Sequence, residues 1–148
     1  MLSDSFKFYW VKDDEFAGSS VPEIKDYSKN AKRYELERVV CLLPYPVKEL
    51  EVVSHSWEKN DVEFINLGMT GGSIPSQEMI DQWLDILKHR KRTMVHCSEG
   101  NGRTGTMLGI ALVEVLNITG QDAFERIRSI NPSAFDSEQQ VSFMKAYK

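Results

Sequence analysis

The sequence predicts an α/β fold in which a central, largely parallel sheet of about four to five strands is flanked by helices. Short β-favouring segments alternate along the chain with segments whose apolar residues recur at helical spacing. The run Val39–Leu43 is apolar throughout, as expected for a central strand that is covered on both faces. No repeat or low-complexity linker divides the 148 residues, so residues 1–148 are expected to form one domain.

The N-terminal half is expected to alternate strands with helices. The expected strands cover Phe6–Val11, Ala17–Ser20, Val39–Leu43 and Val62–Leu67, and the expected helices cover Glu23–Lys32 and Val47–Lys59. Pro22 suits the first turn of the helix that follows it, and Ser20 is the expected N-cap of that helix.

The C-terminal half begins with the glycine-rich loop Gly68–Pro75, after which Ser76 is expected to cap a helix. That helix ends in the basic run Lys88–Arg92. Because the run precedes the next strand, it is expected at the opposite end of the sheet from Cys97, as a solvated helix cap rather than a phosphate- or RNA-binding patch. The remaining expected elements are a strand at Met94-Val95, helices from near Arg103 to Leu116 and over Gln121–Ser129, and a last helix capped by Asp136 or Ser137.

The loop between the strand at Met94-Val95 and the following helix carries the predicted chemistry. A strand, a tight loop and a helix N-terminus direct successive backbone N–H groups toward one point, which favours a bound anion. Cys97 opens the loop, and a helix N-terminus with a nearby cation stabilises the nucleophilic thiolate form of a cysteine. Arg103 closes the loop with a planar fork suited to two phosphate oxygens. The hydroxyl of Thr104 is expected within reach of the Cys97 sulfur.

The motif His96-Cys97-x-x-Gly100-x-x-Arg103-Thr104-Gly105 resembles the H-C-x-x-G-x-x-R-[S/T]-G signature of cysteine-based protein tyrosine and dual-specificity phosphatases. The chain is most similar to the small stand-alone members, and the resemblance extends over nearly its whole length. It implies a phosphotyrosine-phosphatase-like fold in which Cys97 is the nucleophile, Arg103 and Thr104 act with it, and His96 supports the loop. The implied phosphate loop consists of Ser98, Glu99, Gly100, Asn101, Gly102 and Arg103.

The general acid of this family is missing from its usual place. Relatives carry an Asp shortly before a Pro on the loop that corresponds to Gly68–Pro75, whereas Thr70 or Gly71 stands there in this chain. Glu99 and Asp136 are the candidate replacements, and Glu138, near the start of the last helix, is a further one. Two alternatives to a replacement acid stay open: a substrate with a good leaving group, or a protein that binds phosphorylated partners and turns them over poorly.

Two further side chains have alternative interpretations. In some relatives a Gln that aligns with Gln139 orients the hydrolytic water, but Gln140 stands next to it, and either residue suits the N3 capping position of the last helix. Glu99 places a carboxylate on the phosphate loop. It is interpreted either as plain surface or as a group that selects against polyanionic substrates by charge repulsion.

Composition limits the remaining function classes. The net charge of −4 argues against nucleic-acid or anionic membrane partners. The two cysteines do not form a disulfide framework; Cys41, inside an apolar strand, is interpreted as structural. The chain shows neither a signal peptide nor a membrane-spanning run, so a cytoplasmic location is expected. A monomer is the expected oligomeric state. No metal or cofactor is expected, because the loop itself supplies the positive field.

The sequence therefore predicts hydrolysis of phosphate monoesters on protein through a phosphocysteine intermediate. Phosphotyrosine is the first expected substrate, and phosphoserine and phosphothreonine are further ones. The alternatives are a phospho-binding adaptor with weak turnover, an RNA 5′-triphosphatase and a phosphoinositide phosphatase.

Overall fold

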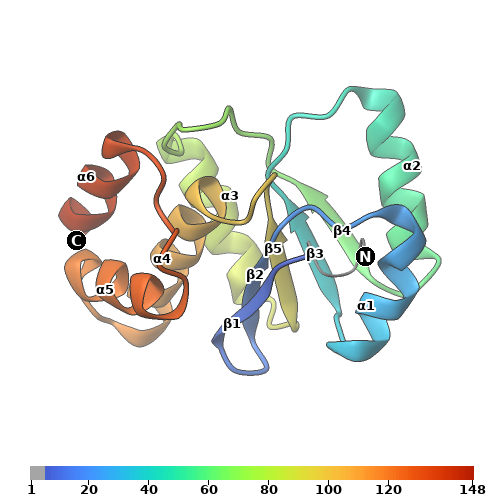
Figure 1. The fold of residues 1–148 in the computed structure, drawn as a ribbon, viewed down its shortest axis with the longest axis horizontal. Coiled ribbons are helices and arrows are strands. Elements are labelled where there is room, and N and C mark those ends of the chain that lie inside the picture. Colours follow the sequence, from blue (N-terminus) through green and yellow to red (C-terminus); the bar gives the residue numbers. More distant parts are fainter. Residues whose placement is uncertain (1–5) are drawn as a thin grey trace.

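The computed structural model describes residues 6–148, and its centre is a five-stranded sheet with the strand order β1-β2-β5-β3-β4 (Figure 1). β1 is antiparallel to β2, and all other neighbouring strands are parallel. The strands are β1 (Phe8–Lys12), β2 (Phe16–Ser19), β3 (Arg38–Cys41), β4 (Glu63–Asn66) and β5 (Thr93–His96). The helices are the 3₁₀ turn η2 (Ile24–Asp26), α1 (Tyr27–Arg33), α2 (Val47–Glu58), α3 (Gln77–Lys88), α4 (Gly102–Leu116), α5 (Gly120–Ile130) and α6 (Glu138–Ala146). The predicted fold class is confirmed.

Helices cover both faces of the sheet, with α1 and α2 on one face and α3 to α6 on the other (Figure 1). Val39 and Met94 pack with Trp57 in the core beneath α1 and α2. Their neighbours Val40 and Val95 pack in the larger core beneath the opposite helices. Because successive strand residues point to opposite faces, this double cover explains why the central strands are apolar at consecutive positions.

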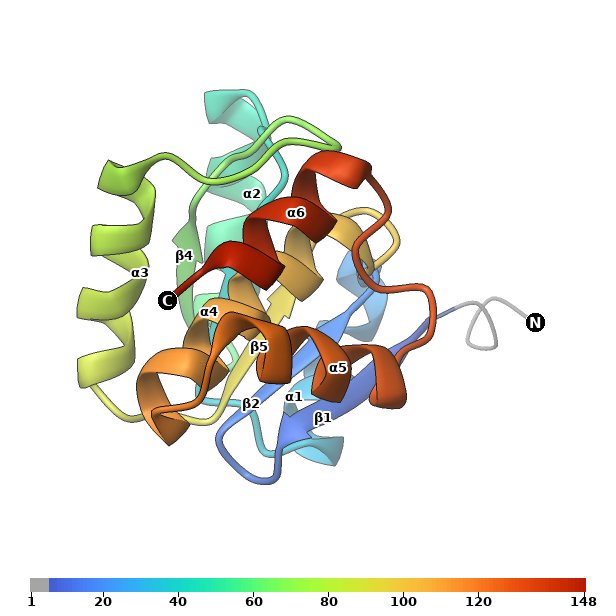
Figure 2. The same cartoon turned by 90° about the vertical axis from the view of Figure 1, so that its left-hand side faces the viewer.

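Helix α4 forms the centre of the larger layer, with α3, α5 and α6 around it (Figure 2). Most of its residues are buried, and the indole Nε1 of Trp83 in α3 donates a hydrogen bond of 2.8 Å to the carbonyl of Met107. A Cβ on Gly109 would overlap the sulfur of Met144 in α6, so this glycine allows the close approach of the two helices. The helix that begins at the predicted phosphate loop is therefore held from several sides.

The start of α1 is where the sequence-based prediction was wrong. The expected helix Glu23–Lys32 is instead the 3₁₀ turn η2 followed by α1, and no side chain caps either element. Ser20 does not act as an N-cap, because its hydroxyl accepts a hydrogen bond of 2.9 Å from the backbone N–H of Lys7. The other predicted elements differ mainly at their ends, and the caps Ser76 and Ser137 are confirmed.

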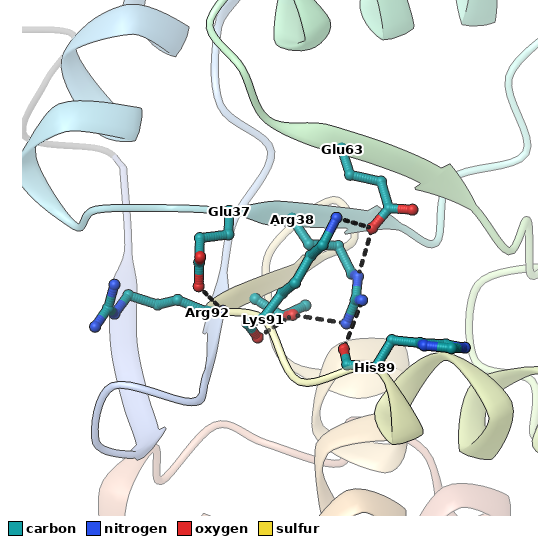
Figure 3. Close-up of polar contacts among 7 residues, drawn as sticks. Glu37, Arg38, Glu63, His89, Lys91 and Arg92 are labelled. Carbon is teal, nitrogen blue, oxygen red and sulfur yellow. Dashed lines mark hydrogen bonds and ion pairs between the residues drawn. The ribbon is translucent and has the colours of Figure 1, made fainter.

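The basic run lies at the amino ends of the parallel strands, as predicted, and its backbone ties these ends together (Figure 3). The buried guanidinium of Arg38 donates to Glu63 Oε1 at 2.9 Å and to the carbonyl of His89 at 2.7 Å. The backbone N–H of Arg92 donates to Glu37 Oε1 at 2.7 Å. The hydrogen bond from Arg38 holds the pKa of the Glu63 carboxyl below its usual value. Residues 88–91 remain exposed. Through these backbone hydrogen bonds the segment stabilises the end of the sheet opposite the phosphate loop.

Candidate active site

The loop between β5 and α4 turns its carbonyl groups outward. The phenol of Tyr9 donates to the carbonyl of Gly100 at 2.6 Å, and the N–H of Val21 donates to the carbonyl of Ser98 at 3.0 Å. The N–H of Phe135 donates to the carbonyl of Asn101 at 3.2 Å. Within residues 6–148, the N–H groups of residues 98 to 101 donate to no protein acceptor. A loop with anchored carbonyls and free N–H groups ahead of a helix N-terminus is suited to a phosphate.

Gly100 and Asn101 give the loop its shape. Gly100 has a φ of +80°, and a Cβ there would lie 2.6 Å from the carbonyl oxygen of Ser19. Asn101 Oδ1 accepts hydrogen bonds from Asn131 Nδ2 at 3.1 Å and from Lys7 Nζ at 2.5 Å. The loop is therefore fixed against β2, the segment before β1 and the segment after α5.

Tyr9, Lys7 and Asn131 are supporting residues that the sequence reasoning missed. Tyr9 lies 91 positions and Asn131 lies 31 positions from their partner Gly100. No local pattern signals such contacts. Burial raises the pKa of Tyr9 well above its usual value, so its phenol is a neutral donor at neutral pH.

Cys97 lies at the base of the loop and is only 3% exposed. The hydroxyl of the fully buried Thr104 donates to Cys97 Sγ at 3.0 Å. The predicted contact between these two residues is thus confirmed. The Thr104 hydroxyl is thus the side-chain donor that the fold places on this sulfur.

Arg103 lies in the first turn of α4 and points its guanidinium toward the Gly68–Pro75 loop. Its Nη1 donates to the carbonyl of Met69 at 2.8 Å, and a Cβ on Gly71 would lie 3.8 Å from the guanidinium carbon. This segment, in which the family resemblance places the general acid, therefore lies beside Arg103. Thr70 and Gly71 are both exposed and bring no ionisable group to it.

His96 lies in the sheet, away from the loop interior. Burial lowers its pKa to about 4, so the ring is neutral. Its Nδ1 lies 3.4 Å from the carbonyl of Cys97, which fits the supporting role that the sequence predicts. Cys41 on the neighbouring strand β3 is also fully buried, and burial raises the pKa of its thiol, so its surroundings fit the structural interpretation.

The candidate acids differ sharply in position. Asp136 lies directly against the phosphate loop. Its Oδ1 is so near Gly102 that a Cβ added to this glycine would overlap it. Glu99 is exposed on the loop and takes part in no hydrogen bond or ion pair within residues 6–148. Glu138 is exposed in the first turn of α6. Of the three carboxylates, Asp136 is the one that the fold brings against the backbone of the loop.

The two glutamines also differ in exposure and in contacts. Gln139 is exposed, whereas Gln140 is fully buried at the N3 position of α6. Gln140 Oε1 accepts from the N–H of Asp136 at 3.1 Å and would lie 2.7 Å from a Cβ on Gly102. Its Nε2 donates to the carbonyl of Ser73 at 3.2 Å. The geometry thus favours Gln140, the alternative position, over Gln139 as the glutamine beside the loop.

Metal-ligating clusters and membrane-spanning helices are both absent from the part of the chain that the structure describes. Among residues 6–148, no three His, Cys, Asp or Glu side chains gather closely enough to hold a metal ion. None of the helices in that range combines the length and apolar composition needed to cross a membrane.

Comparisons with known proteins find phosphatases of similar sequence and of similar fold. A probable protein tyrosine phosphatase type IVA B of Dictyostelium discoideum is 30% identical over 143 residues, which cover 91% of this chain and 80% of that protein. The crystal structure of Tk-PTP in the active form aligns over 93% of both chains, with a TM-score of 0.74 and 23% identity. The catalytic core of the PP-IP phosphatase SIW14 from S. cerevisiae aligns over 95% of this chain and 85% of that chain, with a TM-score of 0.71 and 24% identity.

A family model also matches the sequence over residues 5–147. Its description reads "PTP-SAK: Swiss Army Knife protein, DSP-PTPase phosphatase domain". Because this match spans nearly the whole chain, the protein belongs to the PTP-SAK family of DSP-PTPase phosphatase domains.

Proposed function

We propose that this phosphatase hydrolyses phosphate monoesters on protein, phosphotyrosine first, through a phosphocysteine intermediate. The main observation in support is the contact of Cys97 Sγ with the Thr104 hydroxyl at the base of a loop with free N–H groups. The Cys97 thiolate attacks phosphorus, an S–P bond forms, and the bond to the substrate oxygen breaks. The loop N–H groups and the Arg103 guanidinium stabilise the equatorial phosphate oxygens as charge develops on them. Water then displaces the sulfur and releases inorganic phosphate.

Asp136 is the proposed general acid. Its carboxylate lies against Gly102 at the rim of the loop, and the segment that holds the acid in relatives offers only Thr70 and Gly71 at that place. In the first step the acid form of Asp136 gives its proton to the leaving oxygen. In the second step the resulting carboxylate takes a proton from the attacking water, which restores the acid.

Gln140 and Thr104 are proposed to assist the second step. The carboxamide of Gln140 is fixed between the Asp136 N–H and the Ser73 carbonyl, next to Gly102. That place suits a group that positions the hydrolytic water. Thr104 donates to the sulfur as it leaves phosphorus and regains negative charge. A pure phospho-binding adaptor would need neither a buried nucleophile nor its hydroxyl partner.

The proposed substrate class follows from charge. Glu99 is an exposed carboxylate on the loop, and the whole chain carries a net charge of −4. Both features repel polyanions such as inositol pyrophosphates, phosphoinositides and RNA 5′-triphosphates. An inositol pyrophosphate or a phosphoinositide is the second candidate, because one protein of similar fold is named a PP-IP phosphatase and another, PTPMT1, was crystallised with PI(5)P.

The test compares a phosphotyrosyl peptide with an inositol pyrophosphate at equal concentrations. The peptide is expected to have the higher kcat/KM, and Glu99→Lys should shift the preference toward the polyanion. Cys97→Ser should abolish turnover of both. Turnover that survives in Cys97→Ser would refute the nucleophile assignment, and a higher kcat/KM for the pyrophosphate would refute the substrate class.

The acid is tested separately with a substrate whose leaving group is a poor one. Asp136→Asn should lower kcat for a phosphotyrosyl peptide by about 100-fold or more and remove the alkaline limb of its pH–rate profile. Glu138→Gln is the matched control, since this neighbouring carboxylate makes no such contact with the loop. Equal effects of both substitutions would contradict the assignment.

A further inference from the structure

The connection between α5 and α6, residues 131–137, brings Asp136 to the phosphate loop (Figure 2). The N–H of Phe135 donates to the carbonyl of Asn101 at 3.2 Å, and Asp136 Oδ1 lies against Gly102. The connection therefore follows the start of α4, and the course of its backbone decides where the Asp136 carboxylate lies.

The backbone of this connection is strained at the residue before Asp136. Phe135 has a φ of +62°, in the left-handed region that bulky side chains rarely adopt. Its ring is buried and lies 5.0 Å from that of Phe124 in α5, measured between ring centroids. Such a conformation persists only where the surrounding structure imposes it, and conformations of this kind cluster at functional sites. The turn at Phe135 therefore needs groups that hold it in place.

Arg128, in the last turn of α5, binds the two carbonyls that flank this strained residue. Its Nε donates to the carbonyl of Ala134 at 2.5 Å, and its Nη2 donates to the carbonyl of Phe135 at 3.0 Å. These carbonyls belong to the rigid peptide planes on either side of the Phe135 Cα. A planar fork that fixes both planes fixes φ and ψ of the residue between them.

The plane that follows Phe135 also contains the N–H of Asp136. This N–H donates to Gln140 Oε1 at 3.1 Å. The guanidinium carbon of Arg128 lies 4.9 Å from the centroid of the Phe124 ring, and this contact helps to hold the fork in position. The backbone at Asp136 is thus set by Arg128 from one side and by Gln140 from the other.

The contacts of Arg128 differ from those of a plain cation at a helix end. Such a cation interacts with the last carbonyls of its own helix, whereas Arg128 reaches carbonyls six and seven positions further along the chain. Within residues 6–148 it forms no ion pair. Arg126, on the same helix, is exposed, and its side chain makes no hydrogen bond within that range.

We propose that Arg128 is a positioning residue for the general acid Asp136, because it holds Phe135 in the left-handed conformation that directs the carboxylate to the phosphate loop. A change of φ at Phe135 to the ordinary negative range would turn the chain that follows and move Asp136 away from Gly102. Arg128 itself touches no reacting atom. This inference rests on the proposed function, in which Asp136 gives its proton to the leaving oxygen.

The experiment compares Arg128→Met with the native chain on two substrates that differ in their leaving group. For a phosphotyrosyl peptide, whose leaving oxygen needs a proton, kcat/KM should fall by about tenfold or more, because relief of strain at Phe135 favours the displaced acid by such a factor. For a dinitrophenyl phosphate, whose leaving group departs without a proton, kcat/KM should stay within about twofold. Arg126→Met is the matched control and should change neither value. Equal losses on both substrates in Arg128→Met would show damage to the loop and refute the proposal.

The conservative variant Arg128→Lys keeps the positive charge at the end of α5 and removes the planar fork. It should lose most of the activity toward the peptide that Arg128→Met loses, and it carries the same two-substrate comparison if Arg128→Met does not fold. Native kcat/KM for the peptide in Arg128→Lys would show that charge alone suffices, and would overturn the role given to the two-carbonyl contact.

A double substitution tests whether Arg128 acts through Asp136. In Asp136→Asn the acid is already absent, so the addition of Arg128→Met should lower kcat/KM for the peptide by no more than about twofold. A further loss of about tenfold would mean that Arg128 acts on another part of the site, and the proposal would be wrong.

Amide hydrogen exchange follows the connection without any turnover. The N–H groups of Phe135 and Asp136 should exchange about tenfold faster or more in Arg128→Met than in the native chain, because their acceptors, the carbonyl of Asn101 and Oε1 of Gln140, would no longer be held in register with them. Arg126→Met should leave both rates unchanged. Native exchange rates in Arg128→Met would contradict the proposal.

The outcomes separate this inference from the proposed function. If Asp136→Asn lowers kcat/KM for the peptide and Arg128→Met matches Arg126→Met, Arg128 is not a positioning residue and the proposed acid stands. If Asp136→Asn leaves kcat/KM unchanged, the proposed acid is wrong, and Arg128 has no acid to position whatever the exchange rates show.

Discussion

In the proposed mechanism, the hydrogen bond from Thr104 to the Cys97 sulfur allows the two chemical steps to be separated. Thr104→Val keeps the shape of the side chain and removes the O–H that donates to Cys97 Sγ at 3.0 Å. In the first step the sulfur gives its negative charge to the bond with phosphorus, and in the second step it regains that charge. Loss of the donor should therefore slow mainly the breakdown of the phosphocysteine.

The size of the effect follows from the environment of the bond. Both residues are buried, and a hydrogen bond to a charged partner contributes about 1.5–3 kcal/mol. At 1.36 kcal/mol for each factor of ten, the second step should slow by roughly 10- to 150-fold.

A rapid-mixing assay with 4-nitrophenyl phosphate measures this step directly. Thr104→Val is expected to release a burst of about one aryl oxide per chain, followed by slow steady turnover, because the phosphocysteine accumulates. Thr106→Val is the matched control: this buried hydroxyl, two residues further along α4, donates to the carbonyl of Gly102 at 2.9 Å. The control should keep kcat within about twofold. A fall in kcat without a burst, or an unchanged kcat in Thr104→Val, would refute the assignment.

Three further outcomes are expected. Unfolding free energy should fall by about 2 kcal/mol between pH 7 and pH 5 through His96 alone, because its pKa is near 6.5 when unfolded and about 4 when folded. This contribution is present above the unfolded pKa and is lost as pH falls; a urea titration of His96→Asn that retains the whole slope would contradict it. Gly100→Ala should destabilise the loop and raise the KM for phosphopeptide at least tenfold, since the new Cβ meets the Ser19 backbone; an unchanged KM would show that the loop adapts. Arg103→Lys should lower kcat/KM by about 100-fold or more, because an ammonium cannot bind two phosphate oxygens in the bidentate manner; kcat/KM measured on a phosphotyrosyl peptide checks this.

The elements that sequence could predict are those whose signals are local. Val39–Leu43 could be recognised as a doubly covered strand because consecutive apolar residues indicate burial on both faces. The phosphate loop could be recognised because its residues are contiguous in the sequence. The start of α1 could not be predicted from local sequence. The Ser20 hydroxyl does not cap a helix because it accepts a hydrogen bond from the backbone N–H of Lys7, on the other side of the β1–β2 pair. Local helix propensity carries no information about this competing hydrogen bond.

The same limit applies to the candidate site. Tyr9, Lys7 and Asn131 support the loop across separations of 30 to 94 positions, which no spacing rule connects. The choice between Gln139 and Gln140 depends on a rotation of about 100° per residue around α6, so an error of one position in the helix register exchanges the exposed side chain with the buried one. Sequence could propose the pair, but only the helix start at Ser137 separates its members.

The proposed role of Asp136 as the acid agrees with the way in which the Gly68–Pro75 loop is held. That loop is tied to α6 by two hydrogen bonds, from Ser137 Oγ to the carbonyl of Gly72 at 2.9 Å and from Gln140 Nε2 to the carbonyl of Ser73 at 3.2 Å. It is also tied to Arg103 through Met69. An acid delivered by a moving loop would have to break these bonds in each cycle, whereas Asp136 precedes α6 and already lies against Gly102. In the proposed mechanism, Asp136 is thus a fixed acid beside a loop held in place, and preorganisation replaces loop closure.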